Sequence, residues 1–337
     1  HAREEIARTL GASANEIVFT GGGSEADNLA IFGVTRALRS RGQHVITAAT
    51  EHHAVVHSFH QLRDDGFEVT VLGVNDDGVV DAAEFDAALT PGTIFASIML
   101  ANNEIGSIQP VAQLSAMARA KDVIFHTDAV QAPSFLAIDV RALGVDLLSL
   151  SAHKFYGPKG VGLLYVRAGT PVAPLILGGS QEFSKRAGTE NVSGIVGMAR
   201  ALTLAATERD AHAARVAALR DRFEEQLTAR VSDIRINGKG AQRLPNNSNI
   251  SFAGIPADAM VMRLDLEGAA VSTGSACASG ALEPSHVIEA LGIDARWRTS
   301  AVRFSFGRAT TQAQIDRLAA LVERVAGELR TFSSKGA

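Results

Sequence analysis

The chain has 337 residues, 46% of them hydrophobic and 20% charged, which is typical of folded globular proteins and excludes intrinsic disorder. At about 150 residues per domain, this length predicts roughly two domains. The formal net charge of −4 excludes the basic surface of a general nucleic-acid binder, and a single cysteine excludes an internal disulfide. No apolar run reaches the roughly 18 residues of a membrane span, so we expect a soluble cytoplasmic protein.

Strand and helix patterns alternate through the first half of the chain, after a first predicted helix over 3–10. Short runs rich in β-branched residues predict strands at 16–20, 44–48, 68–74, 94–100, 123–127, 146–151 and 161–166. Amphipathic patterns between them predict helices at 24–40, 54–65, 82–89 and 111–120. Because several strands are apolar throughout, they favour a parallel sheet in a doubly wound α/β domain, which binds ligands beyond the carboxyl ends of its strands.

A second domain is predicted for the C-terminal part of the chain. A long amphipathic helix over 205–230 leads into it, and the boundary is expected near residue 208. Its predicted elements are strands at 234–237, 248–252 and 302–305 and a closing helix at 311–329. We therefore predict a large domain over 1–208 and a small α+β domain over 209–337.

Three glycines, a serine and a glutamate follow the first predicted strand. Glycines let the backbone approach a ligand closely, and the N-terminus of the next helix can bind a phosphate. The alternative is a tight turn in which Ser24 is an ordinary N-cap. A loose dinucleotide-binding pattern is also present through Gly21, Gly23 and Ala26, with Glu51 at the end of the second strand. This loop therefore leaves an oxidoreductase open.

Histidines follow the second strand. His53, His57 and His60 are spaced to line one helix face, where an exposed polar surface is favoured over a metal site because no carboxylate or cysteine lies nearby. His52 lies at the strand end and is placed to stack on a planar ligand.

Polar side chains follow the next strands as well. Asn102 and Asn103 end the fourth run and either form a turn or direct an amide at a ligand. Asp128 ends the fifth run, with Gln131 shortly after it. The carboxylate is either a helix cap or the partner of a cationic group.

The sixth strand ends in Ser151, followed by His153 and Lys154. Most lysines are surface charges, but this one directly follows an apolar strand and precedes a Gly-Pro turn. Partial desolvation there would favour the neutral amine that forms a Schiff base. Farther on, the segment 186–191, which contains Thr189, has the composition of another phosphate-binding loop.

The only cysteine, Cys277, lies among small and polar residues over 272–281. Free cysteines are commonly buried, but this segment has no apolar periodicity and predicts an exposed loop with an accessible nucleophile. Arg303 lies in a strand-like run between apolar residues, where a guanidinium binds a carboxylate in bidentate fashion or forms a structural ion pair.

Taken together in this order, these segments resemble the pyridoxal-phosphate-dependent cysteine desulfurases of the NifS and IscS type, within the class V aminotransferases. The resemblance runs from Ile17 to about Leu329, and its lysine, cysteine and arginine segments are highly specific when present together. The long cysteine loop resembles the IscS/NifS branch rather than the SufS branch. The resemblance implies fold type I of these enzymes, with a mostly parallel seven-stranded sheet in the large domain.

The resemblance also implies roles toward pyridoxal phosphate. Lys154 would hold the cofactor covalently and move protons at the substrate α-carbon, and Asp128 would pair with the ring nitrogen. Gln131 would bind the ring hydroxyl, and His52 would stack on the ring and take part in catalysis. The phosphate contacts implied are Gly23, Ser24, Ser151, His153 and, from the neighbouring subunit of a homodimer, Thr189.

The implied reaction converts L-cysteine to L-alanine. Asn103, which would also contact the cofactor, and Arg303 would orient the substrate, and Cys277 would take its sulfur as a persulfide. Acceptors in this family include iron–sulfur scaffold proteins and tRNA-thiolation carriers.

One departure from the family pattern concerns the start of the chain. Family members begin with a D-x-A-A-T-type segment that covers the substrate site, whereas this chain opens at His1 and directly enters a helix. We expect either a truncated chain or an incomplete site. The alternatives are a selenocysteine lyase or another pyridoxal-phosphate lyase, a dinucleotide-dependent oxidoreductase and a non-catalytic scaffold; the thiol argues against a transaminase.

Overall fold

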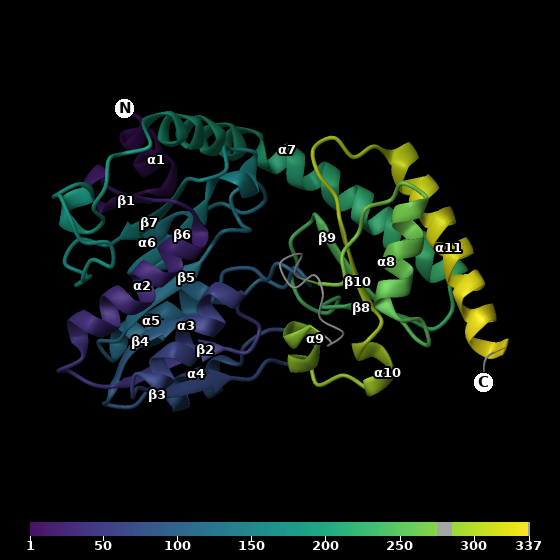
Figure 1. Cartoon of the computed structure of the whole chain (residues 1–337), viewed down its shortest axis with the longest axis horizontal. Helices are drawn as coiled ribbons and strands as arrows, with labels where there is room; N and C mark the ends of the chain where they lie inside the picture. The colour runs from purple at the N-terminus through teal and green to yellow at the C-terminus, as the bar shows by residue number, and fades with distance from the viewer. Residues whose placement is uncertain (275–284, 336–337) are drawn as a thin grey trace. The chain divides into compact units, whose positions relative to one another are not determined.

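The computed structural model describes residues 1–274 and 285–335, the last four of these by their backbone only, and it divides into two compact units (Figure 1). The first unit comprises His1–Gly73, Val80–Ala101 and Gln109–Arg209. The second comprises Val74–Val79, Asn102–Ile108 and Asp210–Ala337. Two short loops that follow strands of the first unit therefore belong to the second.

The first unit contains a seven-stranded sheet. Its strands are β1 (Ile17–Thr20), β2 (His44–Ala48), β3 (Glu68–Leu72), β4 (Thr93–Ser97), β5 (Ile124–Asp128), β6 (Leu147–Ser151) and β7 (Gly162–Val166), in the order β1-β7-β6-β5-β4-β2-β3. The strands from β3 to β6 are parallel, and β7 is antiparallel to both of its neighbours. The predicted mostly parallel sheet is confirmed.

Helices flank this sheet and bury most of its strands. They are α1 (Ala2–Leu10), α2 (Gly23–Leu38), α3 (His53–Asp64), α4 (Ala82–Ala88), α5 (Val111–Ala120) and α6 (Val140–Leu143), with short 3₁₀ turns η1 (Ala14–Glu16), η2 (Ala152–Phe155) and η3 (Glu182–Ser184). Every residue of β2, β4, β6 and β7 is buried, which explains why these strands are mostly apolar and contain no Lys, Arg, Asp or Glu. The edge strand β3 is largely exposed and ends at Leu72, two residues before its predicted end.

Helix α7 (Val192–Arg230) runs from the first unit into the second. It begins 13 residues before the predicted start at 205, because Gly194 and Gly197 lower the helix propensity of its first turns. Asn191 compensates by accepting a hydrogen bond from the backbone N–H of Gly194 at 3.0 Å. Gly197 packs so close to Pro158 that a Cβ atom would lie 3.0 Å from that ring, which accounts for the glycine.

The second unit packs helices on a three-stranded antiparallel sheet. The sheet contains β8 (Ile234–Asn237), β9 (Asn247–Phe252) and β10 (Ala301–Ser305) in the order β10-β9-β8, and the helices besides α7 are α8 (Ala257–Leu266), α9 (His286–Ala290), α10 (Ala295–Arg298) and α11 (Gln312–Lys335). Phe223 of α7 contacts Phe304 and Phe306, with ring centroids 4.9 and 5.4 Å away. In the part of the chain that is described, no helix is long and apolar enough to cross a membrane.

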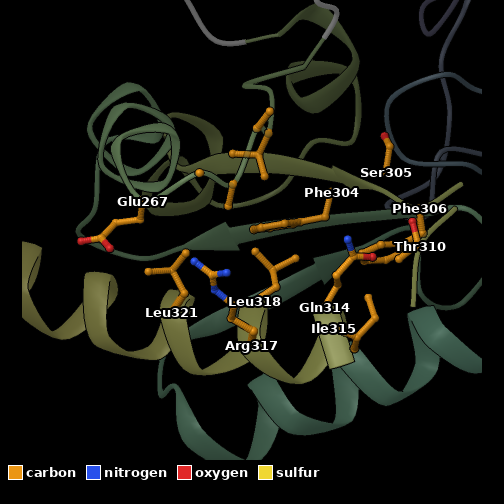
Figure 2. Close-up of a pocket in the computed structure, with 14 residues that line it drawn as sticks. Glu267, Phe304, Ser305, Phe306, Thr310, Gln314, Ile315, Arg317, Leu318 and Leu321 are labelled. Atoms are coloured by element: carbon orange, nitrogen blue, oxygen red, sulfur yellow. The ribbon is translucent and has the colours of Figure 1, made fainter. Parts of the chain in front are cut away.

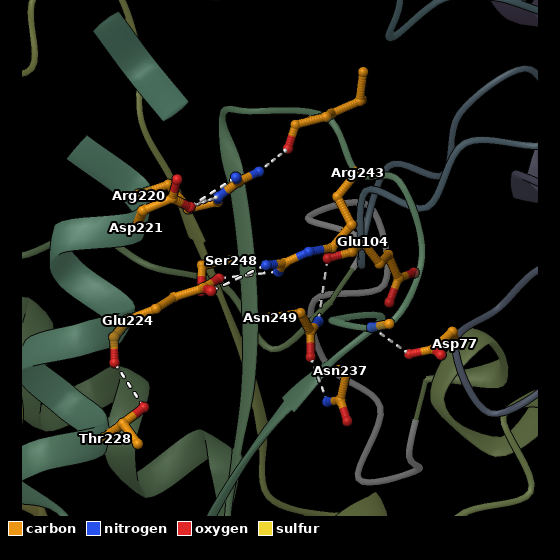
Figure 3. A network of polar contacts seen from close by, with 12 residues as sticks. Asp77, Glu104, Arg220, Asp221, Glu224, Thr228, Asn237, Arg243, Ser248 and Asn249 are labelled. Carbon is orange, nitrogen blue, oxygen red and sulfur yellow. Dashed lines mark hydrogen bonds and ion pairs between the residues drawn. The ribbon is translucent and has the colours of Figure 1, made fainter. Parts of the chain in front are cut away.

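A buried ion pair joins α7 to the segment before β9 (Figure 3). Glu224 accepts two hydrogen bonds from Arg243, at 2.9 and 3.0 Å, and a third from Ser248 at 2.8 Å. Both charged side chains are only 7% exposed. Removing one partner would leave the other charge buried without compensation.

We predict that Glu224→Ala destabilises the second unit by about 3–5 kcal/mol, the usual cost of breaking a buried ion pair. Trp297, the only tryptophan, lies in this unit, so its fluorescence during urea unfolding reports the change. Asp316→Ala is the matched control: it removes a solvent-exposed ion pair with Arg222, so the midpoint should move little. Equal shifts for the two variants would contradict the prediction.

Candidate functional site

A cavity of about 480 Å³ opens at the carboxyl end of β6 in the first unit. It is lined by Gly21, Gly22, Gly23, Ser24, Glu25, Ser151, His153, Lys159 and Gly160. Gly23 is needed for close packing there, because a Cβ atom would lie 3.0 Å from a methyl group of Val130 and 3.3 Å from Cβ of Ser151. The glycine loop after β1 and the end of β6 therefore form the walls of one site.

The lining of this cavity suits an anion. The first residues of the 16-residue helix α2 contribute backbone N–H groups and the positive end of the helix dipole. Ser151 and His153 are hydrogen-bonded to each other, Oγ to Nδ1, at 3.1 Å. Burial and the nearby charges of Lys154 and Lys159 lower the pKa of His153. Gly22, rather than Ser24, is the N-cap, so the alternative in which Ser24 only caps the helix does not hold, and its exposed side chain lines the cavity.

Asp128 is a buried carboxylate at the carboxyl end of β5, in the sheet of the first unit. It is the last residue of β5, is 6% exposed, and accepts a hydrogen bond from the backbone N–H of Val130 at 2.8 Å. Burial raises the pKa of Asp128 to about 6, although its hydrogen bond to Val130 and the positive charge of Lys154 oppose this rise. The charged form of such a buried carboxylate is stabilised most by a cation that is buried beside it.

Lys154 lies on the 3₁₀ turn η2, three residues beyond the end of β6. The adjacent Phe155 is buried, whereas Lys154 itself is exposed. The partial desolvation expected from the sequence is therefore not found, because the turn carries the lysine away from the apolar strand that precedes it. Its charge nonetheless acts on the Asp128 carboxylate.

His52 is the N-cap of α3, and its Nδ1 accepts a hydrogen bond from the backbone N–H of Ala54 at 3.1 Å. The ring is half-buried and held in place by this bond. His53, His57 and His60 stack successively along α3, with centroids 5.2 and 6.2 Å apart. Among the residues with described positions, no group of three histidine, cysteine or acidic side chains is arranged to hold a metal.

Two further buried carboxylates lie near Asp128; the sequence did not single out Asp27, and it indicated Glu51 only as a ribose ligand. Asp27 of α2 and Glu51, which follows β2, are at most 1% exposed, and burial raises the pKa of both. Oδ1 of Asp27 lies 3.7 Å from Nε2 of His126, whose pKa burial lowers to about 3. The sequence signal for Asp27 is its helical spacing from Ala30 and Ile31, which places it on the apolar, buried face of α2.

The dinucleotide-binding alternative is not supported by the position of Glu51. This carboxylate is inaccessible to a ribose, and its Oε1 accepts a hydrogen bond from the backbone N–H of Met99 at 2.7 Å. In addition, the glycine loop follows β1, an edge strand antiparallel to its neighbour.

The other predicted residues of the first unit lie in turns and loops. Gln131 is half-buried, three residues after the end of β5. Thr189 is exposed in the loop before α7. Arg186 attaches this loop to the first turn of α2, because its Nε donates a hydrogen bond to Oε1 of Glu25 at 2.8 Å.

Asn103 and Arg303 belong to the second unit and contact each other. Nη1 of Arg303 donates to the backbone carbonyl of Asn103 at 3.0 Å, and Asn247 donates to the same carbonyl at 3.3 Å. The sequence predicts Asn103 at the end of a strand of the large domain, but its loop packs with the second unit. Cys277 lies outside the described residues.

A second cavity, of about 290 Å³, lies between β10 and α11 in the second unit (Figure 2). Phe304, Leu318 and Leu321 contribute its apolar lining. None of the side chains predicted from the sequence to act on a cofactor or substrate lines it, so this cavity does not contribute to the candidate site.

Lys159 lines the first cavity, although its sequence position alone predicted no role for it. It shares the cavity with His153 and the glycine loop. The sequence feature that indicates a role for Lys159 is its position directly after the Gly-Pro turn that follows Lys154.

Comparisons with known proteins agree on one family. The profile of the aminotransferase class-V family matches residues 1–318. The cysteine desulfurase IscS of Dictyoglomus turgidum is 50% identical over 332 residues, covering 98% of this chain and 84% of that protein. A solved NifS-like protein matches with a TM-score of 0.91 at 36% identity, over 97% of this chain and 87% of that one. SspA in complex with cysteine matches at 0.79 and 36% identity, over 92% and 86% respectively.

We predict that Asp128→Asn stabilises the ligand-free protein at pH 7 by about 3 kcal/mol. The folded-state pKa is raised from 3.8 to about 6, so the folded protein holds the proton more tightly than the unfolded chain. Stability of the wild type should therefore fall, relative to Asp128→Asn, as the pH rises from about 4 to 6. Urea unfolding of both proteins across this range tests the sign, since a constant difference would contradict it.

Proposed function

This chain belongs to the class V aminotransferases and, within them, to the cysteine desulfurases of the IscS type, and on that basis we propose that it converts L-cysteine to L-alanine and takes the sulfur as a persulfide on Cys277. Enzymes of this family depend on pyridoxal phosphate. The observation that carries the proposal is the buried Asp128 carboxylate under the influence of Lys154, in the unit whose anion-binding cavity is formed by the ends of β1 and β6.

The residues of the first unit fit pyridoxal phosphate. The cavity lining supplies the donors that a phosphate needs, and the buried Asp128 carboxylate suits a protonated ring nitrogen. When bound, pyridoxal phosphate supplies an electron sink for the charge released at the substrate α-carbon. We assign covalent attachment to Lys154, the ring face to His52 and the ring hydroxyl to Gln131. The phosphate ligands proposed are Gly23, Ser24, Ser151 and His153, joined by Lys159 and by Thr189 of the partner subunit.

The remaining steps are assigned to side chains of this chain. Arg303 binds the substrate carboxylate and Asn103 orients the substrate amine end against the ring. Nζ of Lys154 removes the proton from the α-carbon. Sγ of Cys277, as thiolate, attacks the substrate sulfur, and an S–S bond forms as the carbon–sulfur bond breaks. The electron pair of the broken bond stays with the carbon skeleton, which is protonated to L-alanine.

We further propose that the protein acts as a cytoplasmic homodimer and passes its sulfur to an acceptor protein such as an iron–sulfur scaffold or a tRNA-thiolation carrier. The dimer is supported by large apolar side chains exposed in the first unit, among them Leu177, Phe183 and Val192, at 80%, 49% and 67% exposure. The single cysteine is consistent with a reducing compartment.

Lys154→Ala is predicted to abolish covalent attachment of pyridoxal phosphate, because no other amine is assigned to that position. Borohydride reduction of the loaded proteins followed by intact-mass measurement should show the added mass on the wild type and not on Lys154→Ala. Lys159→Ala is the matched control: it removes a cation from the same cavity and should weaken binding while retaining the covalent adduct. A reduced adduct on Lys154→Ala would exclude the assignment.

Cys277→Ala is predicted to bind the cofactor and L-cysteine but to form alanine at least about 100-fold more slowly, because the nucleophile that accepts the sulfur is missing. Alanine and sulfide are measured together with the cysteine-induced change in the visible spectrum. Undiminished alanine formation with a normal spectrum would show that the thiol is not the sulfur acceptor.

A further inference from the structure

We propose that Glu104 is a positioning residue for sulfur transfer: it directly follows Asn103, and its carboxylate contacts Gly274 and Ser285, the two described residues that bracket the segment containing Cys277. The proposal rests on the function proposed above and adds a residue to it. All of these groups lie in the second unit.

Glu104 is held rigidly in the loop 102–108. It is 1% exposed, and Oδ1 of Asn102 accepts hydrogen bonds from the backbone N–H groups of Glu104 and Ile105, at 2.8 and 2.9 Å. Asn249 of β9 donates to the backbone carbonyl of Glu104 at 3.2 Å (Figure 3). The backbone of Glu104 is thus fixed by its own turn and by the sheet of the second unit.

Ser285, immediately after the undescribed segment, is bound to this carboxylate. Its Oγ donates to Oε2 of Glu104 at 2.6 Å and accepts from the backbone N–H of Val287 at 3.1 Å. The same hydroxyl therefore caps α9 and joins it to Glu104. A hydrogen bond to a carboxylate is stronger than one to a neutral acceptor, which favours glutamate at this position.

Gly274, immediately before that segment, packs against the same oxygen. It has a φ of +152°, and a Cβ atom there would lie 2.8 Å from Oε2 of Glu104 and 3.3 Å from Cβ of Ser285. The carboxylate occupies the space that a side chain would need. Gly274 and Ser285 are thus neighbours in space, and Glu104 contacts both.

The substrate-binding pair is built into the same cluster. Ser272 and Arg303 exchange two backbone hydrogen bonds, at 2.7 and 3.2 Å, and Nη1 of Arg303 donates to the carbonyl of Asn103. Asn103 directly precedes Glu104. Glu104 is therefore linked to Arg303 through the backbone of Asn103, and through its own carboxylate it contacts both residues that bracket the segment carrying the thiol.

This connection bears on catalysis because transfer requires the thiol and the substrate sulfur to meet in a near-attack geometry. A displacement of about 1 Å can reduce the rate of such a step about 100-fold. Glu104 fixes Gly274 and Ser285, the residues at which the cysteine segment starts and ends, relative to the pair proposed to bind the substrate. Glu104 need not touch the substrate to have this effect.

The test uses the full-length protein loaded with pyridoxal phosphate. We expect Glu104→Ala to retain KM and the cysteine-induced spectral change within about twofold, while kcat for alanine falls at least about tenfold through lost positioning. Persulfide on Cys277, followed by mass spectrometry in a single turnover, should slow by the same factor. A residue needed only for folding would instead change cysteine binding and the emission of Trp297.

Three variants serve as controls. Glu289→Ala removes an exposed carboxylate from α9 and should retain the wild-type rate. Glu104→Gln retains an oxygen that accepts from Ser285 and should recover most of the activity. Gly274→Ala places a methyl group against the carboxylate and should reduce kcat as Glu104→Ala does. If Glu104→Ala does not fold, Gly274→Ala and Glu104→Gln decide between a positioning role and none.

The outcomes separate the two proposals. Without persulfide on the wild type, the proposed function itself fails. If the wild type forms persulfide and both Glu104→Ala and Gly274→Ala form it equally fast, only the positioning role of Glu104 is overturned. That role is likewise overturned if both variants lose cysteine binding together with turnover.

Discussion

The burial of the Asp128 carboxylate at the carboxyl end of β5 is the constraint on which the chemistry of the first unit depends. Removing a negative charge from water is unfavourable, and here it raises the pKa of the carboxyl to about 6. Lys154 lies three residues beyond the end of β6, the parallel neighbour of β5, and its positive charge lowers the pKa of Asp128. The register that pairs Asp128 with Ser149 fixes which residues beyond β6 can act on this carboxylate.

A parallel sheet places the residues that follow its strands at one edge, because the carboxyl ends of parallel strands lie together. The ends of β5 and β6 deliver Asp128 and Ser151 at the same edge, and the glycine loop after the antiparallel strand β1 meets them there. Gly23 permits this approach because a Cβ atom there would lie only 3.0 Å from a methyl group of Val130. The site therefore combines a region that favours an anion with a carboxylate that favours a cation, as an anionic ligand with a protonated ring requires.

The second unit holds together the residues proposed to bind the substrate. The loop 102–108 follows strand β4 of the first unit in the chain, but Asn247 and Asn249 of the second unit donate hydrogen bonds to its backbone. Through this loop, Asn103 and Glu104 are attached to the same sheet as Arg303. The groups proposed to bind the substrate come from distant parts of the chain but belong to one unit, and their relative positions depend on hydrogen bonds within it.

The sequence by itself determined the strands, most of the helices, the sheet type and the family, because buried strands are apolar throughout and the lysine, cysteine and arginine segments are distinctive. The early start of α7 was hidden by Gly194 and Gly197, whose value lies in packing rather than propensity. The exposure of Lys154, the burial of Asp27 and the attachment of the 102–108 loop to the second unit were decided only by tertiary structure. Each depends on contacts between residues far apart in the chain, which local periodicity cannot encode.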